Sequence, residues 1–98
     1  MTDPSQLEIR QNPEAGRFEI DLGDGASAFV EYRIDGQNIL LTHTEVPEAY
    51  EGRGIGSKLA RHVLDYARTE GYRVQALCPF IAAYVERHPE YQSITWGY

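Results

Sequence analysis

The fold of this chain is decided by the stretch Glu51-Gly52-Arg53-Gly54-Ile55-Gly56-Ser57-Lys58-Leu59, called the glycine loop below. It joins the end of an apolar, strand-like run to a strongly periodic helix, with glycine at every second position from 52 to 56. Glycines let backbone N–H groups approach a ligand closely, and the following helix presents the positive end of its dipole. The junction therefore predicts a site for a phosphate or a pyrophosphate.

Two familiar phosphate-binding motifs do not match the spacing of the glycine loop. A Walker A loop requires Gly, four residues and then Gly-Lys-Ser/Thr, whereas the chain has Ser57-Lys58-Leu59 at that spacing. The dinucleotide pattern G-x-G-x-x-G fails as well, because Ser57 or Leu59 stands where the third glycine should be. A nucleotide-binding loop is therefore disfavoured, while a purely structural tight turn stays open as an alternative.

The residues before the glycine loop predict a meander of four antiparallel strands. Leu7, Ile9 and Gln11 alternate in a short first strand, and residues 18–22, 26–34 and 37–46 form the next three. Turn-forming residues separate these runs, and Asp35-Gly36 is a strong two-residue hairpin signal. Strands that are joined by short turns are antiparallel neighbours.

The residues after the glycine loop change from a two-residue to a helical period. Apolar residues at positions 55, 59, 63, 66 and 67 share one helical face, and Gly71 supplies a C-terminal cap. A fifth strand, Arg73 to Leu77, returns beside the fourth and parallel to it, because the helix acts as a right-handed crossover. A second helix begins at Pro79 and ends near His88. The tail from Glu90 to Tyr98 adds a strand or covers a sheet edge.

The composition is that of an ordinary globular chain of 98 residues, which we expect to form a single domain over residues 1–98. The formal net charge of −6 argues against binding to nucleic acid, which requires a basic surface. The apolar runs are too short to span a membrane, and the first six residues do not have the pattern of a signal peptide. No membrane partner is expected.

A single cysteine, Cys78, excludes an internal disulfide framework and is typical of the reducing cytoplasm. The three histidines, His43, His62 and His88, show no metal-ligand spacing with that cysteine. The sequence therefore predicts a cytoplasmic protein without a metal site.

The glycine loop and the elements around it resemble the GNAT superfamily of acetyl-CoA-dependent N-acetyltransferases. The signature of that superfamily, Arg/Gln-x-x-Gly-x-Gly/Ala, lies between its fourth strand and main helix, where this chain has Glu51-Gly52-Arg53-Gly54-Ile55-Gly56. The resemblance implies an α+β fold with a mixed α/β sheet, a minimal GNAT fold. Its parts would be an antiparallel meander of four strands, a crossover helix, a parallel fifth strand and a C-terminal helix. It also implies that acetyl-CoA is the acyl donor.

The resemblance assigns a set of residues to binding of coenzyme A. Amides of the glycine loop and of the helix start would hold the pyrophosphate, and the backbone around Glu45 and Val46 would bind pantetheine and polarise the thioester carbonyl. Glu51 departs from the signature, and its charge beside a pyrophosphate is expected to weaken the affinity unless the side chain turns away. The expected CoA-binding residues are Glu45, Val46, Glu51, Gly52, Arg53, Gly54, Ile55, Gly56, Ser57, Lys58 and Cys78.

Three residues are candidates for catalysis. Aligned with the family, Val85 replaces the tyrosine that commonly protonates the leaving thiolate, and Cys78 lies where the fourth and fifth strands of the family separate around acetyl-pantetheine. The Cys78 thiol is therefore a candidate proton donor or nucleophile, the alternative being a small buried hydrophobe. Glu45 and His43 share one face of the fourth strand and could deprotonate an amine through water.

The other polar and aromatic side chains are expected to have structural roles. His88 is predicted to cap or pack at a helix end, His62 to lie on the surface, and Tyr66, Tyr72 and Phe80 to belong to the core.

The sequence thus predicts an N-acetyltransferase in which an amine attacks the thioester directly within a ternary complex. The first turn is short and few residues follow Tyr91, so the acceptor side is expected to be open, as for an exposed lysine or another protein amine. The alternative function is a non-catalytic acyl-CoA-binding regulatory module. A small interaction domain, in which the glycine loop only turns the chain, is a third possibility.

Overall fold

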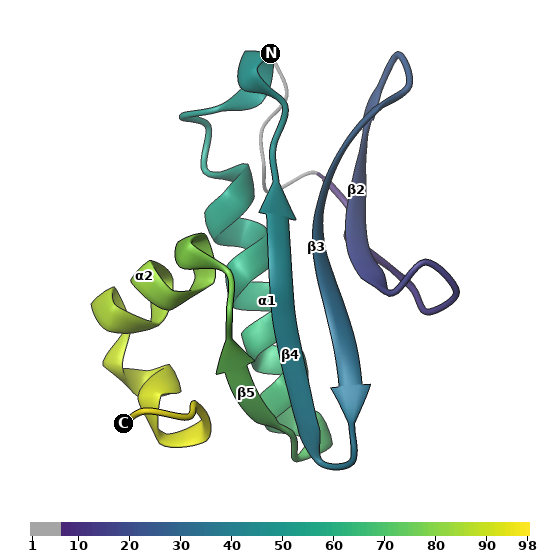
Figure 1. Ribbon diagram of the computed structural model, residues 1–98. Coiled ribbons are helices and arrows are strands. Elements are labelled where there is room, and N and C mark those ends of the chain that lie inside the picture. The colour runs from purple at the N-terminus through teal and green to yellow at the C-terminus, as the bar shows by residue number, and fades with distance from the viewer. Residues whose placement is uncertain (1–6) are drawn as a thin grey trace.

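The computed structural model describes residues 7–98, in which a mixed five-stranded sheet is accompanied by two α-helices (Figure 1). The strands are ordered β1-β2-β3-β4-β5; the first four are antiparallel neighbours, and β5 is parallel to β4. This arrangement confirms the predicted α+β fold with its crossover helix. The elements are β1 Arg10–Asn12, β2 Arg17–Gly23, β3 Ala26–Asp35, β4 Asn38–Glu45, η2 Glu48–Tyr50, α1 Ile55–Glu70, β5 Arg73–Ala76, α2 Pro79–Arg87 and η3 Pro89–Ile94.

The first strand is shorter than the alternation of its residues predicts. Only the three residues of β1 pair with β2, whereas Leu7 and Ile9 precede the strand and pack half-buried against the core. The apolar side chains at these two positions are used for packing and not for extending the strand.

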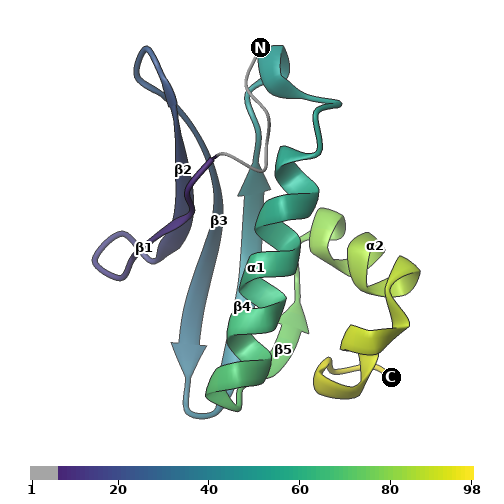
Figure 2. The same ribbon diagram turned by 180° about the vertical axis from the view of Figure 1, so that it is seen from behind.

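The core lies between α1 and one face of the sheet, as the view from behind shows (Figure 2). Six α1 side chains are buried, four of them at positions of the predicted apolar face, while Tyr66 of that face is half-buried. Full burial of one aliphatic side chain contributes about 1.5 to 3 kcal/mol. The inward side chains of the strands, such as Ile20, Val30 and Ile39, complete the core. The buried α1 residues are Ile55, Leu59, Ala60, Val63, Leu64 and Ala67.

A bulge in β4 changes which side chains face the helices. Glu31 of β3 pairs with His43, but Tyr32 pairs with Leu41, so Thr42 is the extra residue. Leu41 therefore faces the core, and after the bulge Thr44, rather than His43, lies on the same side. His43 lies on the opposite face, where its ring is 6.0 Å from the ring of Phe29.

The two parallel strands, β4 and β5, separate halfway along β4. Their pairing ends at Leu41 and Ala76, and the N–H groups of Leu77 and Cys78 both donate to the Leu41 carbonyl, at 3.1 and 2.9 Å. Pro79 then begins α2, so the chain leaves the sheet while β4 continues beyond the end of β5 (Figure 1). As a result, the last part of β4 is paired with β3 alone within residues 7–98.

The C-terminal tail covers the outer edge of β5. After η3, Thr95 forms a single parallel bridge to Val74, and the Trp96 N–H donates to the Val74 carbonyl at 2.9 Å. The Trp96 indole N–H donates to Asn38 Oδ1 at 2.8 Å, and the Arg73 guanidinium lies 4.7 Å from the indole ring. Both predicted roles of the tail are therefore combined: it covers the edge and contributes one strand-like contact.

Two kinds of feature are not found in the part of the chain that the structure describes. None of its helices has the length and the apolar character needed to cross a membrane. Nor does it bring together three or more His, Cys, Asp or Glu side chains in a way that could hold a metal ion.

Candidate active site

The start of α1 is an uncapped helix N-terminus. Gly54 is its N-cap, with a left-handed φ of 80°, and no side chain accepts a hydrogen bond from the first turn. The first intrahelical bond is donated by the Lys58 N–H to the Gly54 carbonyl at 3.0 Å. The N–H groups of Ile55, Gly56 and Ser57 therefore have no intrahelical acceptor, and such groups bind anions well.

A pocket of about 480 Å³ joins this helix start to the end of β4. The glycine loop lines one side of this pocket, and the end of β4 lines the other. The pocket thus brings together residues that were predicted to bind two different parts of coenzyme A. Of the expected CoA-binding residues, Arg53, Lys58 and Cys78 do not line it, whereas Thr44, Tyr50 and Phe80 line it without having been predicted. The complete lining is Thr44, Glu45, Val46, Tyr50, Glu51, Gly52, Gly54, Ile55, Gly56, Ser57 and Phe80.

Glycine is favoured at the three positions of the loop for two different structural reasons. Gly52 and Gly54 have φ of 79° and 80°, a conformation that costs other residues about 1–2 kcal/mol, although a Cβ would have open space at either position. At Gly56 the restriction is steric, because a Cβ would lie 2.8 Å from Cζ of Phe80. The prediction that Phe80 belongs to the core is therefore wrong: the side chain is 38% exposed and forms a wall of the pocket against Gly56.

The side chain of Thr44 lies between the Cys78 thiol and the pocket. Cys78 is the N-cap of α2 and only 4% exposed, and its Sγ donates to Thr44 Oγ1 at 3.3 Å. Thr44 lines the pocket, whereas Cys78 does not. Thr44 was not among the predicted site residues, because the bulge that turns it toward the helices leaves no signal in a strand pattern.

The residues near the family's tyrosine position do not reach the pocket. Val85 is fully buried, as its place on the apolar face of α2 requires. The Tyr84 ring stacks on the His88 ring with centroids 3.8 Å apart, and His88 Nδ1 donates to the Tyr84 carbonyl at 2.7 Å. His88 thus caps and packs at the end of α2, as predicted, while Tyr66 and Tyr72 are half-buried against the core.

His43 and Glu45 lie together on the sheet face that is turned away from α1. His43 Nε2 and Glu45 Oε1 are 3.3 Å apart, which confirms that the two residues share a face, and both side chains are more than half exposed. Glu45 lines the pocket but His43 does not. No helix covers the adjoining face of β3 and β4 in the described residues, so this face is open (Figure 1).

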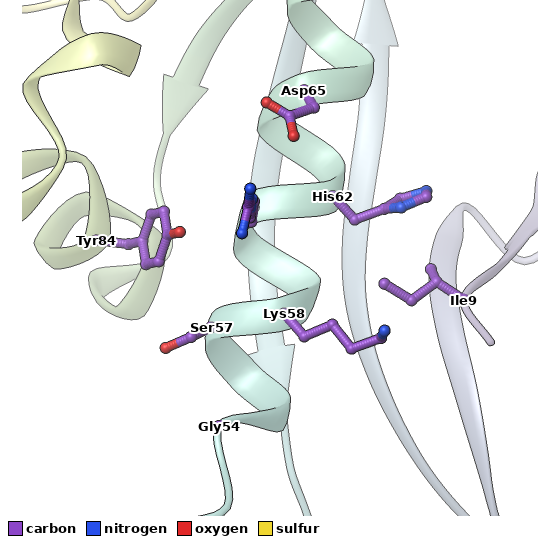
Figure 3. A pocket seen from close by; sticks show the side chains of 8 residues that line it. Ile9, Gly54, Ser57, Lys58, His62, Asp65 and Tyr84 are labelled. Atoms are coloured by element: carbon purple, nitrogen blue, oxygen red, sulfur yellow. The ribbon is translucent and has the colours of Figure 1, made fainter. Parts of the chain in front are cut away.

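A second groove, of about 520 Å³, runs along the outer side of α1 (Figure 3). Lys58 and His62 extend toward Ile9, and Ser57 points to the other side of the helix, toward Tyr84. Partial burial lowers the pKa of His62; the Lys58 charge adds to this effect and Asp65 opposes it. Gly54 and Ser57 line both cavities, so the groove continues from the pocket at the helix start and contains Lys58, which was expected near CoA.

The departure from the family signature is located in the pocket itself. Glu51 is exposed and lines it, directly after the short helix η2. Arg53 is exposed, and its guanidinium lies 5.3 Å from the ring of Tyr50, another lining residue. The glycine loop therefore carries one acidic side chain, Glu51, and two basic ones, Arg53 and Lys58, and of these three only the acidic residue is in the lining.

Comparison with known proteins agrees with this geometry. Residues 17–94 match the family described as GCN5-related N-acetyl-transferase. Protein NATD1 of Mus musculus is 35% identical over 96 residues, which cover 90% of this chain and 87% of that protein; Protein NATD1 of Homo sapiens is 42% identical over 59 residues, covering 59% and 52%. The solution structure of a GCN5-like protein from Staphylococcus aureus is 30% identical, with a TM-score of 0.77 over 100% of this chain and 93% of that one.

The mixed sheet that opens beside an uncapped helix start is the fold of a GNAT-type N-acetyltransferase. The chain belongs to the GCN5-related N-acetyltransferase family.

Proposed function

We propose that this protein is an N-acetyltransferase that takes an acetyl group from acetyl-CoA and transfers it to an amine by direct attack. The observation that carries the proposal is the pocket that joins the uncapped start of α1 to the end of β4, which is paired with β3 alone within residues 7–98. Family membership supports the same chemistry. Bound acetyl-CoA would supply an activated acyl group, a thioester that an amine can attack.

The residues that are present fit the phosphate end of coenzyme A. The amides of Ile55, Gly56 and Ser57 have no intrahelical acceptor, and the open space at Gly52 and Gly54 lets an anion reach the backbone. Lys58 in the adjoining groove adds a positive charge close to the same helix start. These groups would hold the pyrophosphate, together with the loop residues Glu51 and Arg53 through their backbone.

The edge of β4 that extends beyond its pairing with β5 fits an extended chain such as pantetheine. Beyond Leu41 no strand pairs with this edge within residues 7–98, so backbone groups are free to bond a ligand as a neighbouring strand would. Backbone N–H groups around Glu45 and Val46 would bind pantetheine and polarise the carbonyl, as donors aimed at a developing oxyanion do.

The exposed His43–Glu45 pair would take up the proton of the amine. An ammonium must lose a proton before it can attack, and a carboxylate or imidazole in water contact can accept it. Glu45 lines the pocket, and His43 Nε2 lies 3.3 Å from Glu45 Oε1 on the open face. The uncovered sheet face at this pair suits an exposed lysine or another protein amine as the acceptor.

A non-catalytic acyl-CoA-binding module is the second candidate. Two observations favour it: Val85 is fully buried in place of the usual proton donor, and the acidic residue Glu51 lines the pocket. Such a module would bind acyl-CoA with the same amides but would release no thiol.

Two measurements on the full chain test the proposal. Calorimetric titration with CoA and acetyl-CoA tests the binding that both candidates share, and absence of heat up to millimolar ligand would contradict both. Thiol release from acetyl-CoA with a panel of amines and lysine peptides then tests transfer. Saturable binding with no amine-dependent thiol release would favour the non-catalytic module.

A further inference from the structure

We propose that Thr44 gives the proton to the departing CoA sulfur and that Cys78 resupplies it, so that the two residues form a proton relay. The inference rests on the proposed function and adds a catalytic residue to it. It replaces the direct role of the Cys78 thiol with an indirect one, because that thiol does not line the pocket while Thr44 does.

The hydrogen-bond geometry gives the relay its direction. Cys78 Sγ donates to Thr44 Oγ1 at 3.3 Å, so the thiol is within hydrogen-bond reach of the hydroxyl oxygen that it would reprotonate. Within residues 7–98 the Thr44 hydroxyl donates to no other group, which leaves its own proton free to point into the pocket. The separation of β4 from β5 just before Thr44 provides the space that this proton faces.

The chemistry requires both partners. A hydroxyl is too weak an acid to protonate a thiolate unless it regains a proton in the same step, and a thiol, a much stronger acid than an alcohol, is a suitable source. The thiolate left on Cys78 would sit at the N-cap of the nine-residue helix α2, where the helix dipole stabilises negative charge.

The step balances without any further reagent. The amine nitrogen bonds to the acetyl carbon, the carbon–sulfur bond breaks, and the proton of Thr44 moves to the departing sulfur. Thr44 takes the proton of Cys78, and the proton lost by the amine through Glu45 and His43 passes to solvent, from which Cys78 is reprotonated. The sum is amine plus thioester to amide plus thiol.

The relay predicts distinct effects for substitutions at Thr44. Thr44→Val removes the hydroxyl but keeps the shape, and should lower kcat about a hundredfold, within the range of general acid catalysis. Thr44→Ser keeps the hydroxyl and should stay within about threefold of wild type on the same scale. Thr42→Val is the matched control, because Thr42 donates to the Glu31 carbonyl and does not line the pocket.

A double-mutant cycle tests whether the two residues act as one unit. Cys78→Ala and Thr44→Val should each lower kcat, and the double variant should be no slower than Thr44→Val alone. If the losses of kcat in the two single variants multiplied in the double variant, the relay would be overturned. An acetyl group found on Cys78 by mass spectrometry as an intermediate would overturn it as well.

A binding measurement tests the contact to sulfur independently of turnover. The wild-type chain should bind CoA about fivefold more tightly than desulfo-CoA, as one hydrogen bond would give, and Thr44→Val should remove that preference. If Thr44→Val and Thr42→Val preferred CoA over desulfo-CoA equally, or had equal turnover, the relay would be overturned while the proposed acetyltransferase would stand. CoA binding without any thiol release by wild type would contradict the proposed acetyltransferase, and the relay with it.

Discussion

Gly54 and Gly71 bound the two ends of α1 in nearly the same left-handed conformation, with φ of 80° and 79°. At neither glycine would a Cβ meet a heavy atom of a non-neighbouring residue within 4 Å. Their surroundings differ in one respect: Gly54 lines the pocket, whereas Gly71 closes the helix with its N–H donating to the Arg68 carbonyl at 3.3 Å. Comparing the same substitution at Gly54 and at Gly71 therefore distinguishes its cost to the backbone from its effect on ligand binding.

Gly54→Ala and Gly71→Ala should lower the free energy of unfolding by a similar amount, about 1 to 2 kcal/mol each, because alanine resists the left-handed region. Only Gly54→Ala places a methyl group in the pocket, so it should weaken CoA binding about tenfold or more, by over ~1.4 kcal/mol. Urea unfolding and calorimetry measure the two quantities. Equal CoA affinities in both variants would show that the glycine loop only turns the chain.

Gly56→Ala tests the contact between the glycine loop and α2. The added methyl would meet Cζ of Phe80, the far end of a partly exposed ring that can turn aside, so the cost in stability should be about 1 kcal/mol or less. CoA affinity should fall, because the displaced ring forms the pocket wall. In the Phe80→Ala background the same substitution should cost almost no stability, and an undiminished cost there would rule out the steric explanation.

Glu51→Gln should tighten CoA binding. Removing an exposed carboxylate from the pocket relieves its repulsion of the pyrophosphate, an effect of about threefold at low salt that shrinks as salt screens it. Glu48→Gln, on the neighbouring short helix but outside the lining, is the matched control. Titrations at two salt concentrations measure the effect, and unchanged affinity at low salt would show that the Glu51 side chain points away from the ligand.

The hydrogen bond between Tyr91 and Asp65 predicts an alkaline loss of stability. Burial, with the 2.7 Å bond to the Asp65 carboxylate, raises the pKa of Tyr91 to about 12. The folded protein therefore holds this proton more tightly than the unfolded chain, whose tyrosine titrates near ~10. The stabilisation is complete below about pH 10 and is lost as the pH rises toward 12.

Tyr91→Phe should remove this pH dependence and cost about 2 kcal/mol at neutral pH, because the bond goes to a charged acceptor. Denaturant unfolding from pH 8 to 11 measures it. Tyr98→Phe gives the comparison for an exposed tyrosine outside the core, since desolvation and the hydrogen bond to Glu86 raise the pKa of Tyr98 as well. An unchanged alkaline profile in Tyr91→Phe would assign the loss to other groups.

The main course of the fold could be predicted from the sequence because its signals are local. Alternating apolar residues, the Asp35-Gly36 hairpin and the helical period after Ile55 each depend on neighbouring residues only. Strand order followed from short turns and one crossover helix. The first strand was expected to be longer because alternation at Leu7 and Ile9 serves packing equally well.

The details of the pocket could not be predicted, because they depend on contacts between distant residues. A bulge at Thr42 leaves no mark in an apolar pattern, yet it turns Thr44 toward the site and sets Cys78 behind it. Phe80 looked like a core residue because its exposure depends on where α2 starts relative to Gly56, a contact that local patterns do not encode.

The most direct test of the account is a backbone amide NMR titration of the full chain with acetyl-CoA. The largest shifts are expected at the start of α1, from Gly54 to Ser57, and at the end of β4, from Thr44 to Val46, with little change at Gly71. No shifts up to millimolar acetyl-CoA, or shifts confined to residues away from these two segments, would contradict the proposed site.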